Sequence, residues 1–346
     1  MEERLLGRTG LRVNAIGFGG IPIQRVSEEK AIRVVRRCYE LGINYFDTAR
    51  GYTTSEERIG KALQGVRDEV ILATKSHART KKELLENLEM SLANLRTDHI
   101  DVYQLHNVSS EEAWGKITSP DGALEGLYEA RDAGRAKHIG VTSHSPELLT
   151  KIVEEEIFET AMIPFNYLAT EPEKRLLPLC RRKGVGTVTM KPFGGGAFSD
   201  ANTALKYVLA NKAVDIVIPG MMSEAEVEEN VRVGGEDLAL TDLELKVIEG
   251  DRVRLGNQFC RSCDYCQPCP QGIPISFVLR AEAGMLRRMG WTEGIIRQTR
   301  EAEPKVATCL KCGICESRCP YKLPIKELLP QKMSSLMKRL DEKSIP

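Results

Sequence analysis

The sequence predicts an α/β protein: a closed (β/α)8 TIM barrel followed by a small helical segment that is rich in cysteine. From about residue 14 to residue 236, short apolar runs alternate with amphipathic helical patterns, which is typical of repeated βα units. Eight of each occur, and eight βα units in roughly 250 residues fit a closed barrel better than an open sheet. Beyond residue 257 the composition changes to Cys, Pro, Arg and Met, which indicates a second domain.

The expected strands and helices follow one another in alternation along the chain. Strands are expected at 15–17, 43–47, 70–74, 100–105, 138–141, 161–164, 186–190 and 215–218. Helices are expected at 27–41, 55–63, 81–95, 122–133, 146–155, 171–183, 202–211 and 223–233. A further helix over 241–249 precedes a boundary at 251–257, so we expect domains at 1–250 and 257–346.

The composition excludes several classes of protein. The chain has 346 residues, and Lys plus Arg equals Asp plus Glu at 49 each, so no net charge attracts nucleic acid or an anionic membrane. The N-terminus has no apolar signal region, and no run of 18 uncharged apolar residues occurs, so we expect a cytoplasmic protein without membrane insertion. Eight of the ten cysteines lie between Cys260 and Cys319, which favours metal binding over disulfides, while Cys38 and Cys180 are expected to be buried.

Four reactive side chains lie at or just after the ends of three neighbouring expected strands. They are Asp47, Tyr52, Lys75 and His106. Because the carboxyl ends of barrel strands share one rim, we expect these groups to meet there. A phenol becomes a useful acid at neutral pH when a nearby ammonium stabilises its phenolate, and a carboxylate can hold that ammonium in place. An imidazole can then orient a substrate oxygen, so the four groups form a coherent acid–base device.

The motifs around these residues resemble the aldo-keto reductase superfamily. They are FDTARGY (46–52), SEExIG (55–60), ATK (73–75) and DHIDVYQLH (98–106), and their order and spacing match through roughly residue 235. The resemblance implies a catalytic tetrad of Asp47, Tyr52, Lys75 and His106 with Tyr52 as the general acid. It also implies a nicotinamide cofactor and a small carbonyl or alcohol substrate.

The resemblance also implies a set of cofactor contacts at the barrel mouth. The stretch 17–22 lacks the last glycine of a G-x-G-x-x-G fingerprint, in agreement with a family that does not use one. Thr142, Ser143 and Asn166 are expected to reach the carboxamide. Lys191, Pro192 and Phe193 occupy the position where the family commonly has an aromatic ring, although Lys191 is not aromatic. The other expected contacts are Gly19, Gly20, Gly194, Gly220, Met221, Glu226, Glu229 and Asn230, of which the last two would lie at the adenine.

The segment 218–230 bears on the choice between NADH and NADPH. NADPH-preferring relatives have Lys or Arg there to pair with the 2′-phosphate, whereas this segment has no cation and includes Glu226. An uncompensated phosphate near that carboxylate is electrostatically unfavourable. We therefore expect NADH to bind at least as well as NADPH.

Two cysteine motifs predict iron–sulfur clusters after residue 257. The first contains Cys260, Cys263, Cys266 and Cys269 at x2 spacing, and the second contains Cys309, Cys312, Cys315 and Cys319 with x3 before the last cysteine. Three cysteines at successive x2 spacing and a fourth followed by proline are typical of ferredoxins, whereas structural zinc sites usually pair their ligands. Two 4Fe-4S clusters are expected, with zinc as the alternative. The fourth cysteine of each motif would serve the other cluster if the ferredoxin pattern holds.

Helical patterns over 275–289 and 292–303 lie between the two motifs, so the segment is expected to be an α-helical ferredoxin-like domain. Its clusters would either relay electrons, with a redox partner protein, or only stabilise the domain. The sequence therefore supports a nicotinamide-dependent oxidoreductase that interconverts a carbonyl and an alcohol. An electron-transfer protein whose barrel is mainly a scaffold is the alternative.

Overall fold

A closed barrel of eight parallel strands forms the first unit of the protein. The computed structural model describes residues 1–262, 265–286, 289–319 and 321–343. Neighbouring strands pair in chain order from β3 to β10, and Gly17 N–H donates to Val217 O at 2.9 Å to close the ring. The strands are β3 (Phe18–Gly19), β4 (Tyr45–Asp47), β5 (Ile71–Ser76), β6 (Ile100–Leu105), β7 (Ala136–Thr142), β8 (Thr160–Pro164), β9 (Gly186–Met190) and β10 (Ile216–Ile218). The predicted (β/α)8 barrel is confirmed.

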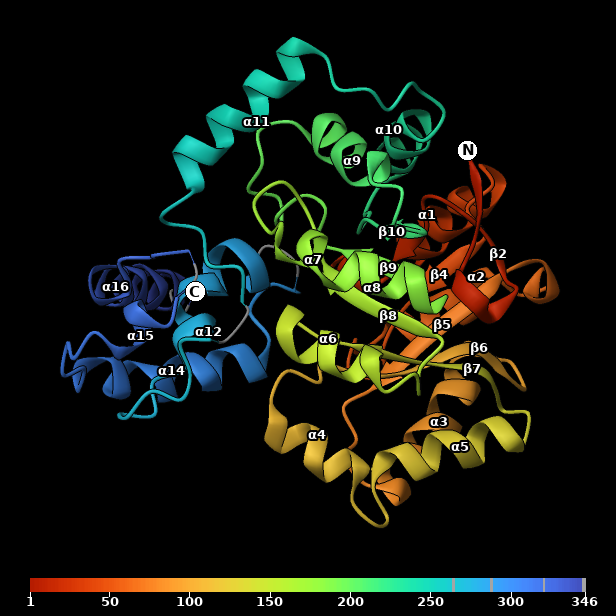
Figure 1. Ribbon diagram of the computed structural model, residues 1–346, viewed down its shortest axis with the longest axis horizontal. Coiled ribbons are helices and arrows are strands. Elements are labelled where there is room, and N and C mark those ends of the chain that lie inside the picture. Colours follow the sequence, from red (N-terminus) through yellow and green to blue (C-terminus); the bar gives the residue numbers. More distant parts are fainter. Residues whose placement is uncertain (263–264, 287–288, 320, 344–346) are drawn as a thin grey trace. The chain divides into compact units, whose positions relative to one another are not determined.

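Helices follow the strands and surround the barrel (Figure 1). They are α1 (Glu28–Glu40), α2 (Ser55–Ala62), α3 (Lys81–Leu95), α4 (Glu111–Thr118), α5 (Ala123–Asp132), α6 (Pro146–Glu154), α7 (Glu171–Lys174), α8 (Leu176–Lys183), α9 (Ala201–Ala210) and α10 (Glu224–Val233). Several begin at a side-chain cap, as at Ser27, Thr80 and Ser223, whose hydroxyl accepts an N–H of the first turn. Short 3-10 turns occupy Gly7–Thr9, Ile21–Arg25 and Arg67–Glu69.

An antiparallel hairpin that the sequence analysis did not predict closes the N-terminal end of the barrel. It consists of β1 (Glu3–Leu5) and β2 (Arg12–Asn14). Leu6 and Val13 are fully buried in an apolar cluster with side chains from the starts of the strands, such as Tyr45. Gly7 has a φ of +51°, and a Cβ there would lie 2.2 Å from the Gly186 nitrogen, so only glycine fits. Because this end is filled, the opposite end is the one open to chemistry.

The second compact unit is helical and comprises Leu245–Pro346 together with Gly195–Ser199. Its helices are α11 (Asp242–Leu255), whose first turn belongs to the barrel unit, α12 (Ile275–Arg280), the π-helical segment Ala281–Leu286, α14 (Glu293–Ala307), α15 (Ile314–Ser317) and α16 (Ile325–Lys343). Apolar side chains of α12, α14 and α16 form one core, which includes Val278, Ala302 and Leu336. The predicted helical character of this region is confirmed.

The loop that follows β9 is divided between the two units. Residues up to Gly194 belong to the barrel unit, but Gly195–Ser199 groups with the C-terminal unit. There Ser199 N–H donates to Asp251 Oδ2 at 2.9 Å, Arg254 donates to Ala197 O at 2.8 Å, and the ring centres of Phe198 and Phe259 lie 6.2 Å apart. This division of the loop was not predicted from the sequence.

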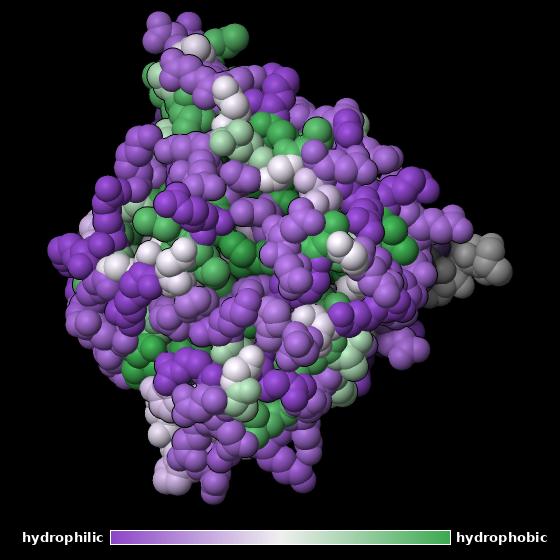
Figure 2. Space-filling view, turned by 90° about the vertical axis from the view of Figure 1, so that its right-hand side faces the viewer, coloured by the Kyte–Doolittle hydropathy of each residue, from purple (hydrophilic) through white to green (hydrophobic). Residues whose placement is uncertain are grey.

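The exposed face in Figure 2 is mostly hydrophilic, with hydrophobic residues in small separate groups. Within the described ranges, no helix is both long and apolar enough to cross a membrane.

Candidate active site and cysteine pocket

The C-terminal ends of β4, β5 and β6 bring the four expected catalytic side chains together. Strand register pairs Asp47 with Ala73 and Lys75 with Gln104, which aligns the three strand ends. Lys75 Nζ donates to Asp47 Oδ1 at 2.5 Å and to Thr48 O at 2.7 Å. Lys75 and Asp47 are each only 2% exposed, so this is a buried ion pair at the base of the mouth.

Tyr52 and His106 complete the group. Tyr52 lies in the turn between β4 and α2, hydrogen-bonds with Lys75, and has its ring centre 5.1 Å from Lys75 Nζ. The ring of His106 meets that of Tyr52 edge to face, at 5.7 Å between centroids and an interplanar angle of 82°. A phenol, an ammonium, a carboxylate and an imidazole are therefore contiguous, and this arrangement can deliver a proton to an oxygen placed beside Tyr52 and His106.

The electrostatics of the group separate the roles of its members. Burial opposes the charged form of Lys75, but attraction to Asp47 and Tyr52 and hydrogen bonds with both outweigh it, so the pKa of Lys75 is raised and the ammonium persists. Burial also raises the pKa of Asp47, against the pull of Lys75. Burial, followed by the charges of Lys75 and neighbouring groups, lowers the pKa of His106 well below its usual value. His106 is therefore suited to donate a hydrogen bond as a neutral ring.

Asn166 and Lys191 are joined at the same end of the barrel. Asn166 Nδ2 donates to Lys191 O at 3.0 Å, and Lys191 has a φ of +60°, unusual for a residue with a side chain. Lys191 Nζ donates to His144 Nε2 at 2.7 Å, and His144 Nδ1 donates to Asn107 Oδ1 at 2.8 Å. These hydrogen-bonded side chains, which link the loops after β6, β7 and β9, were not predicted from the sequence.

The other residues expected near the nicotinamide are built into their loops. Thr142 Oγ1 accepts the N–H of Asn107 at 2.8 Å, and Ser143 Oγ accepts that of Ser145 at 2.9 Å. Pro192 is buried, and Phe193 packs against the barrel core. Gly194 has a positive φ, as do the two glycines that follow it, so this loop requires residues without a Cβ.

The expected glycine contacts Gly19, Gly20 and Gly220 lie where the barrel closes. A Cβ on Gly19 would meet Ile218 O at 2.8 Å, and a Cβ on Gly220 would meet the Pro22 side chain at 2.5 Å. Gly20 is similarly crowded by Asp47 O at 2.7 Å. Close packing of the backbone therefore accounts for these glycines without a ligand.

The segment expected at the adenosine surrounds the start of α10. Glu226 Oε2 accepts the N–H of Met222 at 2.6 Å, and Ser223 Oγ caps the helix by accepting the N–H of Glu226 at 3.3 Å. Met221 and Asn230 are buried, whereas Glu229 is exposed. The carboxylate of Glu226 is thus fixed in place beside this segment.

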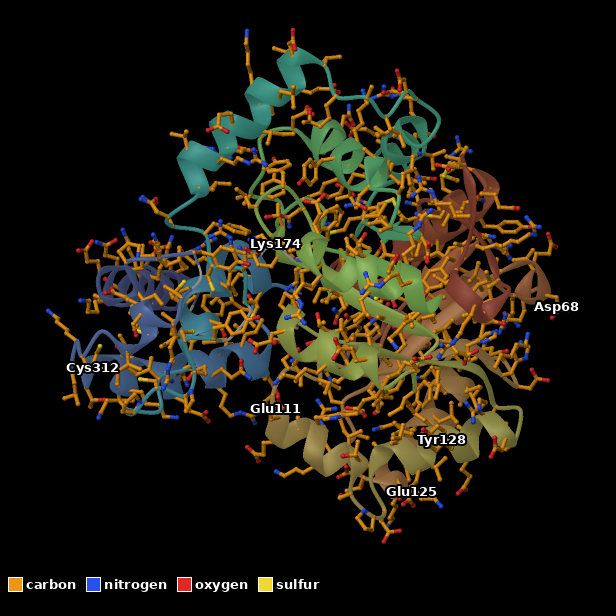
Figure 3. The ribbon with its side chains drawn as sticks, in the orientation of Figure 1. Asp68, Glu111, Glu125, Tyr128, Lys174 and Cys312 are labelled. Atoms are coloured by element: carbon orange, nitrogen blue, oxygen red, sulfur yellow. The ribbon has the colours of Figure 1, made fainter. Side chains whose placement is uncertain are left out.

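Five of the eight motif cysteines line one pocket in the C-terminal unit. They are Cys266, Cys269, Cys309, Cys312 and Cys315, so both motifs contribute to the pocket. Cys260 is buried, Cys319 is half-buried, and Cys312 is exposed near the edge of the view in Figure 3, whereas Cys263 lies outside the described residues. In the described part of the chain, no three His, Cys, Asp or Glu side chains are placed to hold a single metal ion. Thiols spread around a pocket fit a multi-iron cluster better than one tetrahedral ion.

Comparison with known families gives two matches along the chain. The aldo/keto reductase family matches residues 15–204, which is 190 of 346 residues. A 4Fe-4S dicluster domain matches residues 259–324. The two matches coincide with the strands that carry the tetrad and with the cysteine pocket.

Individual relatives agree with the barrel match. The chain is 30% identical to L-galactose dehydrogenase of Arabidopsis thaliana over 70% of this chain and 89% of that protein. It is 27% identical to L-glyceraldehyde 3-phosphate reductase of Escherichia coli over 57% of this chain and 62% of that protein. A solved aldo-keto reductase from Bacillus halodurans superposes with a TM-score of 0.64 at 29% identity, covering 72% of this chain and 96% of that one. The chain is therefore an oxidoreductase of the aldo/keto reductase family that carries a C-terminal 4Fe-4S domain.

Proposed function

We propose that the protein interconverts a small carbonyl compound and its alcohol with NAD(P)H, and that its clusters exchange electrons with a redox partner protein. The observation that carries the proposal is the buried Lys75–Asp47 ion pair, with Lys75 hydrogen-bonded to Tyr52 and His106 in contact with the Tyr52 ring. We assign the carbonyl chemistry to residues 1–250 and the clusters to residues 257–346.

The side chains divide the work of reduction among them. When bound, the reduced nicotinamide would supply the hydride, two electrons and one proton, that the carbonyl carbon accepts. Tyr52 gives its proton to the carbonyl oxygen, and the Lys75 ammonium stabilises the phenolate that remains. Asp47 holds that ammonium, and His106 donates a hydrogen bond to the same oxygen. In the reverse direction Tyr52 accepts the proton of the alcohol.

The cofactor site that we propose lies across the ends of β7 to β10. Asn166 has one amide N–H directed to Lys191 O and a second one that can reach a carboxamide, and the positive φ of Gly194 suits a backbone that approaches phosphates. Thr142, Ser143, Pro192 and Phe193 support these loops. Because the fixed carboxylate of Glu226 disfavours a 2′-phosphate, we propose that NADH binds at least as well as NADPH.

For the clusters we propose two 4Fe-4S centres with crossed ligands. Cys309, Cys312 and Cys315 line a pocket together with Cys269, which is the set expected for one centre, and Cys266 lines the same pocket. Cys260, Cys263, Cys266 and Cys319 would then hold the other. The exposure of Cys312 supports electron exchange with another protein, because transfer requires a centre close to the surface.

The test begins with protein purified without oxygen. Iron and acid-labile sulfide are measured, and carbonyl reduction is assayed with NADH and with NADPH. General acid catalysis is worth roughly 10²- to 10⁴-fold, so Tyr52→Phe should lower kcat by that factor. Tyr128→Phe removes a phenol on α5, away from the strand ends, and serves as the matched control (Figure 3).

Equal turnover of Tyr52→Phe and the wild type would remove Tyr52 from the mechanism. The scaffold alternative predicts a different pattern: clusters that accept and donate electrons, but no carbonyl activity in the wild type with either cofactor. Normal turnover in a variant without either cluster, such as Cys260→Ala and Cys266→Ala combined with Cys312→Ala and Cys315→Ala, would eliminate electron relay as part of catalysis.

A further inference from the structure

His77 lies directly beside the expected catalytic imidazole. The β5–β6 register pairs Ser76 with Leu105, so the next residues along the two strands are His77 and His106. Their rings are stacked, with 3.8 Å between centroids and an interplanar angle of 28°. His77 is exposed at the mouth, whereas His106 is only 9% exposed, so one ring covers the other.

The hydrogen bonds at His106 hold its backbone. Its backbone is fixed, because its N–H donates to Ser76 O at 2.8 Å and its carbonyl accepts from Arg79 Nη2 at 2.9 Å. Its Nδ1 atom, however, is buried and has no hydrogen-bond partner among the residues that the structure describes. Catalytic histidines are commonly oriented by a hydrogen bond to this atom. Here the ring instead stacks on His77 and meets the Tyr52 ring edge to face.

We propose that His77 is a positioning residue that holds the imidazole of His106 edge-on to Tyr52, with Nε2 available to the substrate oxygen. The proposal rests on the proposed carbonyl reduction. It adds a residue that acts through His106 and contacts neither the transferred proton nor the hydride.

The charges around the stack favour an uncharged His106. Lys75 and Arg79 come from β5 and the loop after it, and His144 comes from the loop after β7. Tyr52 comes from the loop after β4, and Asp47 is paired with Lys75. Burial is the largest cause of the lowered pKa of His106, and Lys75, His77, His144 and Arg79 add to it. A neutral ring with its proton on Nε2 leaves Nδ1 as a lone-pair acceptor, which agrees with an atom that has no donor beside it.

Two substitutions at His77 separate the stack from the imidazole chemistry. His77→Ala removes the ring, and His77→Phe keeps a ring that can stack but cannot bind a proton. Aromatic pairs stabilise their geometry enough to change a rate roughly 3- to 10-fold, so His77→Ala should lower kcat by that factor while KM for the cofactor stays unchanged. His77→Phe should retain kcat to within roughly twofold. His99→Ala, which removes a histidine just before β6 at the opposite end of the barrel, is the control.

The second measurement is the NMR titration of His106 in full-length protein labelled at histidine Cε1, with the five histidine signals assigned by substitution. In His77→Ala, solvent reaches His106, so its titration should move to higher pH than in the wild type, and the acidic limb of kcat should move with it. An unchanged titration and an unchanged kcat in His77→Ala would overturn the proposal. So would a loss in His77→Phe equal to that in His77→Ala. A wild type without carbonyl activity would refute the proposed function. The role of His77 would still be tested, because the titration of His106 needs no turnover.

Discussion

Replacing Lys75 by methionine should destabilise the barrel as well as abolish catalysis. Methionine leaves the Asp47 carboxylate, 2% exposed in the wild type, with Gln104 Nε2 at 3.4 Å as its remaining side-chain partner among the described residues. Removing one partner of a buried ion pair costs about 3–5 kcal/mol, because the other charge remains buried without compensation. Replacing both partners by uncharged groups of similar size often changes the free energy of unfolding little. Lys75→Met with Asp47→Asn should therefore recover most of the loss in unfolding free energy, but no turnover.

The effect of pH on Lys75→Met follows from the pKa of Asp47. Burial already raises that pKa in the wild type, and removal of the ammonium raises it further. A carboxyl group whose folded pKa is raised contributes stability below its unfolded pKa, and this contribution is lost as the pH rises through the folded pKa. Relative to the wild type, Lys75→Met should therefore be less stable at pH 8 than at pH 5.5. The double variant should show no such difference.

Urea unfolding can be followed in the barrel alone. The chain has two tryptophans, Trp114 on α4 and Trp291 in the C-terminal unit. In a Trp291→Phe background, the fluorescence of Trp114 reports on the barrel. If the double variant is no more stable than Lys75→Met, the buried carboxylate is not the cause of the loss, and the electrostatic reasoning fails.

Three further predictions concern the barrel floor, a buried carboxylate and the cofactor. Leu6→Ala should lower the free energy of unfolding, measured by urea unfolding, by about 2–5 kcal/mol, because Leu6 is fully buried at the N-terminal end of the barrel. Leu5→Ala should change it little, because Leu5 is 54% exposed. Equal losses in the two variants would contradict the burial of Leu6. Glu56→Ala should cost about 1–3 kcal/mol, because the donors of Arg50, Thr74 and Asn94 lose this 1% exposed carboxylate as their acceptor, while Glu57→Ala should be tolerated; a stable Glu56→Ala would refute this. Met222→Arg should tighten NADPH binding roughly tenfold or more in fluorescence titrations and leave NADH unchanged; an equal gain for both cofactors would count against a 2′-phosphate contact.

The sequence predicted those features that depend on periodicity and on motif spacing. Alternating apolar runs and helical patterns repeat eight times, and this count alone distinguished a closed barrel from an open sheet. The positions of Asp47, Lys75 and His106 at strand ends were sufficient to predict a common rim, because parallel strands place their carboxyl ends together.

Other elements carried no such signal. Strands β1 and β2 have three residues each and only Val13 is buried within them, so their pattern is too short to register as a period. The first barrel strand was expected at 15–17, but regular pairing begins at Phe18, because residues before it join β10 only through single bridges and loop hydrogen bonds. Helix α4 lies in a long loop and buries one side chain, Ile117, fully.

At the mouth of the barrel, too, some features were predictable from the sequence and others were not. The tetrad was evident from its motifs, but the stack of His77 on His106 depends on the register of β5 against β6, which a single sequence does not specify. The hydrogen bonds that join Lys191 to His144 and His144 to Asn107 depend on backbone conformations with positive φ at Lys191 and Asn107. Such conformations are rare for residues with side chains, so propensity argues against them.

The shared loop after β9 constrains how the two units can be separated. Phe198 has Phe259 as its ring partner, and the carbonyl of Ala197 is held by Arg254, so a chain cut before residue 250 would leave this loop without either anchor. An isolated barrel would consequently expose an aromatic side chain in the loop after β9. Domain-swapping or gene-fusion experiments should therefore exchange Gly195–Ser199 along with the cysteine-rich region.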